Sequence, residues 1–429
     1  MTRIHISQGR IIDPENGTDS IGDIYIADNR IFSTMGQSDS FDADITIDAR
    51  NQIVCPGFID LSVRLREPGA TQKATIASEV KAAAASGVTA LCLPPDTSPC
   101  IDNPAVVELI EDKAKVADYR QIYPIGALTY KLQGQELSSM FALKNAGCIA
   151  VSNAQMPIAN LLILRRAMEY AASFDLLLIY RPQDYYLSQQ GCAHEGMVAT
   201  RYGLPAIPDI AETTALLQCL ELVAHTGCRV HFGQISCAKS IDYIRQAKDS
   251  GLPVSADVAI HQLHLTEHDV LPFDGVYHVN PPFRREADRQ ALRKAINEGV
   301  LDAICSDHQP HNIDAKLGAF PETEPGISSL ETLLPLTLSL IDENKLDLMQ
   351  AIAVLTTNPA KILGLEAPGL AVGKFADLCI FDPEMTWQIN PETWLSSGRN
   401  TPYWQQNLRG KVTHTIQNGR LIFGQGDFF

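Results

Sequence analysis

The stretch Ala85-Ser86-Gly87, followed by the apolar residues 88–93, contains the pattern that decides the fold. A helical segment ends in a small or polar residue plus glycine, which adopts the left-handed conformation that closes many helices. A short apolar strand then follows at once. The same pattern returns along the chain at Gly147, Gly227, Gly251 and Gly299. Helix and strand therefore alternate through the middle of the sequence.

Eight apolar stretches are the predicted strands of this middle region. They lie at residues 57–63, 88–93, 121–127, 148–151, 176–180, 228–232, 253–258 and 301–306. Helix-length stretches separate most of them, for example residues 74–86, 159–173 and 211–224. Strands buried on both faces are apolar throughout, as in parallel sheets. Eight strand–helix units predict an α/β fold, a (β/α)8 TIM barrel over residues 55–369.

The two ends of the chain have a different pattern. Residues 1–54 and 370–429 alternate apolar and polar side chains and contain turn sequences such as Asn16-Gly17 and Asn418-Gly419. Turns of this kind join antiparallel strands. Neither end is long enough to bury a core of its own, so we expect one small β-sandwich domain built from both termini.

The composition argues against several classes of partner. The 429 residues include 50 acidic and 34 basic ones, a formal charge of −16, which disfavours binding to nucleic acid or to an anionic membrane. No apolar run approaches the roughly 20 residues of a membrane span, and residues 1–7 lack the apolar stretch of a signal peptide. Ten scattered cysteines form no C-x-x-C pair. We therefore expect a reduced, cytoplasmic protein.

A long motif after the first predicted strand indicates a family. Residues 56–69 read PGFIDLSVRLREPG, which resembles the motif P-G-x-x-D-x-H-x-H-x-R-x-P-G of the dihydroorotases in the cyclic amidohydrolase superfamily. Further matches lie at residues 92–97, 203–205, 279–284, 302–311, 325–332 and 358–360. The resemblance implies a barrel beside a β-sandwich, with one or two zinc ions at the barrel mouth. There they activate the water that opens or closes the dihydroorotate ring.

The residues at the family's metal-ligand positions do not suit zinc. The two histidines of H-x-H fall at Ser62 and Arg64. The bridging acid falls at Asn153, the next histidine at Tyr180 or Arg181, and the one after that at Gln234; of six positions, only Asp307 is kept. A catalytic zinc needs about three protein ligands and an open position. We therefore expect no metal cofactor, except under the alternative of an active zinc enzyme.

Other family residues are retained at the mouth. By resemblance, Arg66, Asn280 and His311 match residues that grip the substrate, and Asp307 matches the general acid/base, idle here without metal. These side chains either form a site for an orotate-like anion or only hydrogen-bond the strand ends. Asp60 and Asp307 need a countercharge in such a site. We expect the arginines at positions 64 and 181 to supply it, in structural replacement of the metal.

The resemblance to one subgroup implies a function without catalysis. Some bacteria have inactive dihydroorotase-like chains that assemble with the catalytic chain of aspartate carbamoyltransferase, and this sequence resembles those. We expect a structural subunit in pyrimidine biosynthesis, homo-oligomeric within a larger hetero-complex. The alternative is an active zinc-dependent cyclic amidohydrolase that uses Asp307, His308, His311 and His261. A metal-free enzyme that uses Asp307 and Arg64 on another substrate is a third interpretation.

Several further residues have both a functional and a structural interpretation. His261 and His264 could bind a rescue metal, but a structural role is the simpler expectation. Residual metal at His308 and His311 is left open. Cys55 and Cys100 have no base at a suggestive spacing, so we expect incidental thiols rather than nucleophiles. Residues 312–325 resemble the family's substrate lid.

Overall fold

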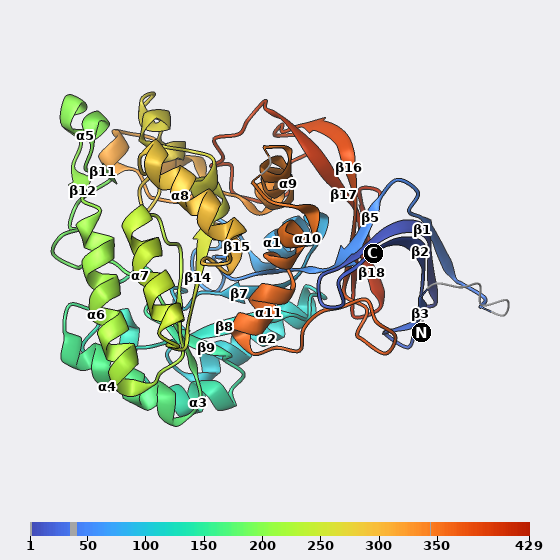
Figure 1. Cartoon of the computed structure of the whole chain (residues 1–429), viewed down its shortest axis with the longest axis horizontal. Helices are drawn as coiled ribbons and strands as arrows, with labels where there is room; N and C mark the ends of the chain where they lie inside the picture. The colour runs from blue at the N-terminus through green and yellow to red at the C-terminus, as the bar shows by residue number, and fades with distance from the viewer. Residues whose placement is uncertain (1, 35–40, 344) are drawn as a thin grey trace.

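The computed structural model describes residues 2–34, 41–343 and 345–429. Its central element is a barrel of eight parallel strands at the positions that the apolar stretches predicted (Figure 1). The strands are β6 Phe58–Asp60, β7 Val88–Leu93, β8 Ile122–Ala127, β9 Ala150–Ser152, β10 Leu177–Tyr180, β13 Val230–Phe232, β14 Val254–Ala259 and β15 Ala303–Cys305. The prediction of a TIM barrel is confirmed.

The barrel closes between its first and last strands, just beyond their carboxyl ends. The Arg64 N–H donates to the carbonyl of His308 at 2.9 Å, and the His308 N–H donates to the carbonyl of Ser62 at 3.0 Å. These two bonds join the segments that follow β6 and β15. The closure therefore brings the residues of the 56–69 motif against those of the 302–311 motif.

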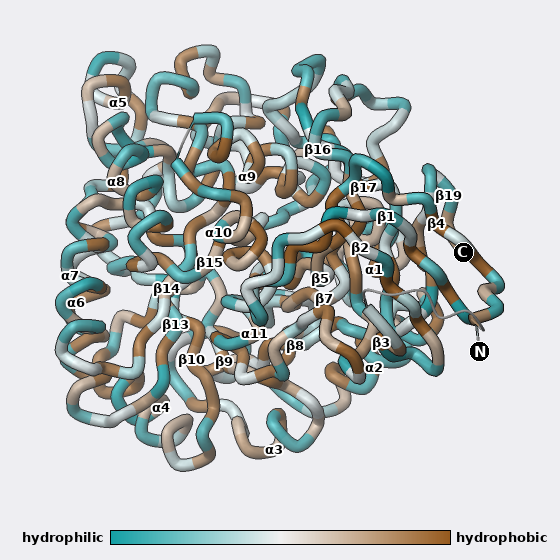
Figure 2. Tube along the Cα trace, turned by 45° about the vertical axis from the view of Figure 1, so that its right-hand side comes forward, coloured by the Kyte–Doolittle hydropathy of each residue, from teal (hydrophilic) through white to brown (hydrophobic). Residues whose placement is uncertain are grey.

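Helices cover the outside of the barrel, as Figure 1 shows for α6, α7 and α8. In order they are α1 Ile76–Ala85, α2 Pro104–Val116, α3 Met140–Asn145, α4 Leu161–Ser173, α5 Met197–Tyr202, α6 Ile210–Thr226, α7 Ala238–Asp249, α8 Glu286–Asn297, α9 Leu333–Asp342, α10 Leu348–Ala353 and α11 Thr357–Leu363. Hydrophilic residues recur along α6 and α7, whereas β10 is hydrophobic (Figure 2). None of the described helices has the length and apolar character needed to cross a membrane.

Short elements build the loops around the barrel. Strands β11 (Ala193–His194) and β12 (Ala206–Ile207) form a separate parallel pair. Single turns of 3-10 helix are η1 Tyr130–Leu132, η2 Ile260–Leu263, η3 Glu267–Val270, η4 Gly275–Tyr277, η5 Ile313–Lys316, η6 Phe320–Glu322 and η7 Leu330–Thr332. The first follows β8, and the other six lie in the segments after β14 and β15.

Both ends of the chain form one further sheet, so the expected β-domain built from both termini is present (Figure 1). The N-terminal strands are β1 Ile4–Asp13, β2 Thr18–Ala27, β3 Arg30–Thr34, β4 Ile45–Asp48 and β5 Ile53–Pro56. The C-terminal strands are β16 Leu378–Gln388, β17 Asn407–Gln417, β18 Arg420–Gly424 and β19 Asp427–Phe428. Eight of the nine strands follow one hydrogen-bonded path, in which β5 pairs with β16 and so links the two termini, and β4 pairs with β1 beside this path.

The segment between β16 and β17 leaves this sheet and reaches the barrel mouth. Its Asn400 accepts the His311 N–H at 2.8 Å and donates to the carbonyl of Gln309 at 2.8 Å. Ser396 donates to the Glu79 carboxylate at 2.6 Å. The β-domain therefore contributes side chains to the wall of the mouth.

The glycine at the end of α1 has a steric role that predicts a stability effect. Gly87 has a φ of 78°, and a Cβ there would collide with Cys379 Sγ and the Phe58 ring. We expect Gly87→Ala to destabilise the fold by about 2–5 kcal/mol, the sum of left-handed strain and overpacking. Gly227→Ala, at φ 67° in open space, is the matched control and should cost only about 1–2 kcal/mol. Equal midpoints of thermal unfolding for the two variants would contradict the packing argument.

Candidate functional site

Arg64 lies at the centre of the barrel mouth with two carboxylates. Its Nε donates to Asp96 Oδ2 at 2.7 Å, and its Nη1 donates to Asp307 Oδ1 at 3.3 Å. The side chain is 6% exposed. Burial alone would lower the pKa of Arg64, but the charges of Asp96 and Asp307 raise it above its ordinary value. The expectation that an arginine supplies the countercharge is confirmed for Asp307.

Asp307, the one retained ligand position, has both carboxylate oxygens engaged. Oδ1 accepts from Ser62 Oγ at 3.2 Å as well as from Arg64, and Oδ2 accepts from Gln309 Nε2 at 3.0 Å. Burial raises its pKa above the ordinary value, although Arg64 and Arg181 act in the opposite direction. The carboxylate is therefore a structural acceptor held by protein donors.

The surroundings of Asp60 differ from our expectation of an arginine countercharge. Its Oδ1 accepts the backbone N–H groups of Ser62 at 3.2 Å and Ser306 at 3.1 Å, and no arginine forms an ion pair with it among the described residues. Oδ2 is buried and has no hydrogen-bond partner among the described residues. Burial raises the pKa of Asp60 to about 7. The prediction of an arginine countercharge is wrong for this residue, because a proton can neutralise it instead.

The side chains at the remaining ligand positions of the family lie in different surroundings. Asn153 accepts from Thr129 Oγ1 at 2.6 Å and donates to two loop carbonyls, those of Leu132 and Met156, so it holds the loop after β8. Tyr180 packs edge-on against Phe232 in the core. Arg181 and Gln234 both line two small cavities at the mouth. Of the two candidates for the histidine after the fifth strand, Arg181 is the one at the mouth.

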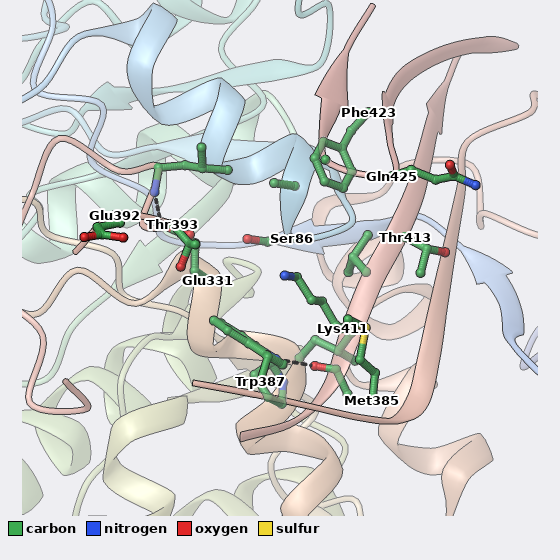
Figure 3. A pocket seen from close by; sticks show the side chains of 17 residues that line it. Ser86, Glu331, Met385, Trp387, Glu392, Thr393, Lys411, Thr413, Phe423 and Gln425 are labelled. Carbon is green, nitrogen blue, oxygen red and sulfur yellow. Dashed lines mark hydrogen bonds between the residues drawn. The ribbon is translucent and has the colours of Figure 1, made fainter. Parts of the chain in front are cut away.

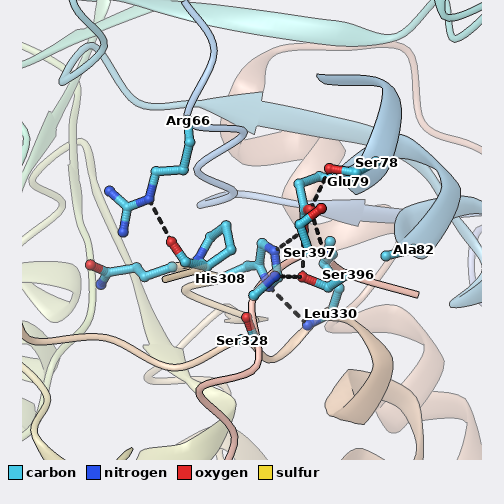
Figure 4. Close-up of polar contacts among 12 residues, drawn as sticks. Arg66, Ser78, Glu79, Ala82, His308, Ser328, Leu330, Ser396 and Ser397 are labelled. Carbon is cyan, nitrogen blue, oxygen red and sulfur yellow. Dashed lines mark hydrogen bonds and ion pairs between the residues drawn. The ribbon is translucent and has the colours of Figure 1, made fainter. Parts of the chain in front are cut away.

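The three predicted substrate-gripping residues are divided between two places. Arg66, labelled in Figure 4, donates from Nε to the carbonyl of Pro310 at 2.9 Å. Its Nη2 lies 3.0 Å from His311 Nε2. Burial and then the Arg66 charge lower the pKa of His311 to about 2, so its ring is neutral. Asn280 instead lines one of the cavities that contain Arg181. Arg66 and His311 therefore bind each other as well as the loops.

His308 is committed to a buried network (Figure 4). Its Nδ1 accepts the backbone N–H groups of Ser329 at 3.0 Å and Leu330 at 3.3 Å, so Nε2 carries the proton and donates to Glu79 at 2.7 Å. Burial would raise the pKa of Glu79, but the bond from His308 leads the contacts that lower it below its ordinary value. Neither ring nitrogen of His308 is free for a metal.

Comparison with known proteins agrees with this architecture. Residues 51–240 match the family described as dihydro-orotase-like, and residues 195–422 match the amidohydrolase family. The chain is 46% identical to a dihydroorotase-like protein of Pseudomonas aeruginosa, over 97% of this chain and 99% of that one. It is 40% identical to a dihydroorotase of Syntrophotalea carbinolica, over 99% and 100% of the two chains.

The chain belongs to the dihydroorotase-like proteins of the amidohydrolase family. Its fold also matches solved amidohydrolase structures: L-hydantoinase from Arthrobacter aurescens superposes with a TM-score of 0.88 at 21% identity, over 100% of this chain and 98% of that one. At that identity the likeness concerns the fold.

The donor set of this dihydroorotase-like protein does not fit the zinc that its family implies. Among the described residues, no three His, Cys, Asp or Glu side chains are grouped so that they could hold a metal ion. Asp307 is the one anionic donor left at the ligand positions, and it is ion-paired with Arg64. A guanidinium about 4 Å from Zn²⁺ would repel it by roughly 8 kcal/mol at an effective dielectric of about 20.

The remaining candidate metal ligands and nucleophiles of this dihydroorotase-like protein have structural surroundings. Burial lowers the pKa values of His261 and His264 to about 3, and His261 packs edge-on against Phe283. Cys55 is buried in β5, and burial raises the pKa of Cys100 to about 11.

The residues of the lid-like segment 312–325 are held by several hydrogen bonds, such as the one from the Glu324 N–H to the Ala315 carbonyl at 2.9 Å.

A cavity near the junction of the two domains lies outside the mouth, and no sequence pattern predicted it. It has a volume of about 440 Å³ and lies between α9 and strands β16–β18 (Figure 3). Trp387, Phe423 and Leu334 supply apolar walls, and Glu331 and Lys411 supply polar groups. Glu79 and Asp96 are site residues that the sequence analysis did not identify, because their partners His308 and Arg64 are distant in sequence.

The raised pKa of Asp60 predicts a pH dependence of stability. Asp60 binds its proton more tightly in the folded chain, where its pKa is about 7, than in the unfolded chain, so its contribution is present at low pH and is lost as pH rises through 7. Asp60→Asn should therefore gain stability over the wild type by up to about 4 kcal/mol between pH 4 and pH 8.

Urea unfolding at each pH measures this difference. The exposed Asp112 gives the matched control, since Asp112→Asn should follow the wild-type curve at every pH. Parallel curves for Asp60→Asn and the wild type would contradict the buried, protonated state.

Proposed function

We propose that this dihydroorotase-like protein has no dihydroorotase activity and serves as a structural subunit. The observation that carries the proposal is the Arg64 guanidinium, ion-paired with Asp307 at a position where the family has a zinc-binding histidine. Ser62, Asn153, Arg181 and Gln234 at the other former ligand positions support it.

The chemistry of the mouth supports the same proposal. Without a metal, the pKa of an attacking water is about 16 instead of about 7, so hydroxide is scarce at neutral pH. A replacement base would have to be free, whereas Asp307 accepts three bonds and His308 is engaged at both ring nitrogens. These contacts support the proposal that the mouth lacks an activated nucleophile.

The proposed partner is the catalytic chain of aspartate carbamoyltransferase, which the family resemblance implies. In this proposal the protein is homo-oligomeric within the larger complex, acts in pyrimidine biosynthesis and works in the cytoplasm. Its charge of −16 favours a partner with a basic patch. A barrel whose mouth is fixed by internal ion pairs suits a scaffold, because such a subunit needs no moving lid.

Metal content and turnover test the inactivity. Protein purified with zinc present should contain far less than one zinc per chain and show no dihydroorotase turnover, because five of six ligand positions lack a zinc donor. Elemental analysis and an assay in both directions measure this, with the Syntrophotalea carbinolica dihydroorotase as the parallel preparation. One zinc per chain together with turnover would establish the active enzyme instead.

Assembly is a separate prediction. The protein and the aspartate carbamoyltransferase catalytic chain of the same organism should co-elute in size exclusion at a mass above either alone. Light scattering on the eluted peak measures the stoichiometry, and L-hydantoinase from Arthrobacter aurescens, which shares the fold, is the control that should not co-elute. Separate elution, with the carbamoyltransferase assembled and fully active by itself, would overturn the structural role.

A further inference from the structure

Arg181 presents a buried positive charge that forms no ion pair among the described residues. The residue follows β10 and is 8% exposed. Nη2 donates to Gln183 Oε1 at 2.7 Å, but Nη1 is buried and has no hydrogen-bond partner in the described part of the chain. Burial lowers its pKa to about 10, so the guanidinium is still charged at neutral pH. A buried charge of this kind is costly unless it is paired.

The neighbouring carboxylates are already in use. Asp307 and Asp96 are both ion-paired with Arg64, and the second oxygen of Asp307 accepts from Gln309. Arg66 adds a further positive charge close by. Glu212, in the wall of the smaller cavity, is engaged as well, because its carboxylate accepts from Ser236, Cys237 and Ser240. The Nη1 group of Arg181 is therefore left for an acceptor on a ligand, and an anion is the acceptor that a guanidinium binds most strongly.

The space beside Arg181 has the size and lining for a small anion. Two cavities, of about 30 and about 10 Å³, share Arg181 and Gln234 in their walls. A volume of about 10–15 Å³ on this measure already holds one water molecule. Ser152 lines the larger cavity, and its hydroxyl accepts from the Ala154 N–H, which leaves the hydroxyl proton available to a ligand.

We propose that the former metal position has become a site for a small monovalent carboxylate, bound by Arg181 with Ser152 and Gln234 beside it. The proposal rests on the proposed absence of a catalytic metal. Pro94, Ile125 and Ile179 wall the cavity with apolar groups, and its volume of about 30 Å³ limits the ligand to one of formate size. A planar carboxylate matches the N–H groups of a guanidinium better than a spherical halide does.

Thermal unfolding in sodium formate tests the site. Ionic strength is held constant with a bulky sulfonate salt, and chloride is the second probe. Formate should raise the unfolding midpoint of the wild type saturably, by on the order of 3 °C at a hundredfold its Kd. The shift should vanish in Arg181→Met and persist in the control Arg201→Met, whose arginine is exposed.

The second readout compares the stability of Arg181→Met with that of the wild type in the absence of formate. Arg181→Met should then be at least as stable as the wild type, because it removes an unpaired buried charge, and formate should reverse that order. Three results would overturn the proposal: equal shifts in wild type and Arg181→Met, lower stability of Arg181→Met at every formate concentration without a formate effect, or stabilisation by chloride alone.

The zinc content of the same samples separates this inference from the proposed function. Absent zinc without any formate effect would overturn the carboxylate site and leave the inactive scaffold standing. Stoichiometric zinc with turnover would overturn the proposed function. A saturable, Arg181-dependent formate effect in zinc-free protein supports the site.

Discussion

The ion pair between Arg64 and Asp307 is the interaction on which the barrel mouth depends. It joins the segments that follow the first and last barrel strands, where two backbone hydrogen bonds also close the barrel. Asp96, after the second strand, binds the same guanidinium. One side chain therefore ties three strand ends together. Removing one partner from a buried pair of this kind typically costs about 3–5 kcal/mol, because the other charge is left without compensation.

A second buried network begins at His308, the residue after Asp307. Glu79 on α1 accepts from His308 after β15 and from Ser396 of the segment that leaves the terminal sheet. Asn400 of that segment binds the loop at Gln309 and His311. The two domains are therefore joined by polar bonds at the place where a catalytic relative needs open coordination positions and access for substrate.

The sequence was sufficient for the barrel because its signals are local. Glycine closes a helix within one turn, and a parallel strand buried on both faces is apolar in every register, so residues 88–93 could be placed from their own composition. The ligand positions could be read because residues 56–69 resemble the family motif, and residues two apart in an extended segment lie on one side of it. Ser62 and Arg64 indeed lie together at Asp307.

The charges and partners that depend on the folded environment could not be read in this way. Asp60 holds its proton through burial, and nothing in its neighbours in sequence indicates that. Glu79 is separated from His308 by 229 residues and from Ser396 by 317. The cavity at Glu331 and Trp387 exists only because α9 packs near the terminal strands.

An arginine is not equivalent to a zinc ion at the same position. A zinc ion brings two positive charges to one point and binds carboxylates and histidines around it, whereas Arg64 brings one charge on a planar group with fixed donor directions. Its donors satisfy Asp307 and Asp96, which lie within their reach, and leave Asp60 to a proton. Arg181 contributes a second charge, and its Nη1 has no hydrogen-bond partner among the described residues. Arg64 therefore joins the strand ends through two ion pairs, whereas Arg181 forms none among the described residues.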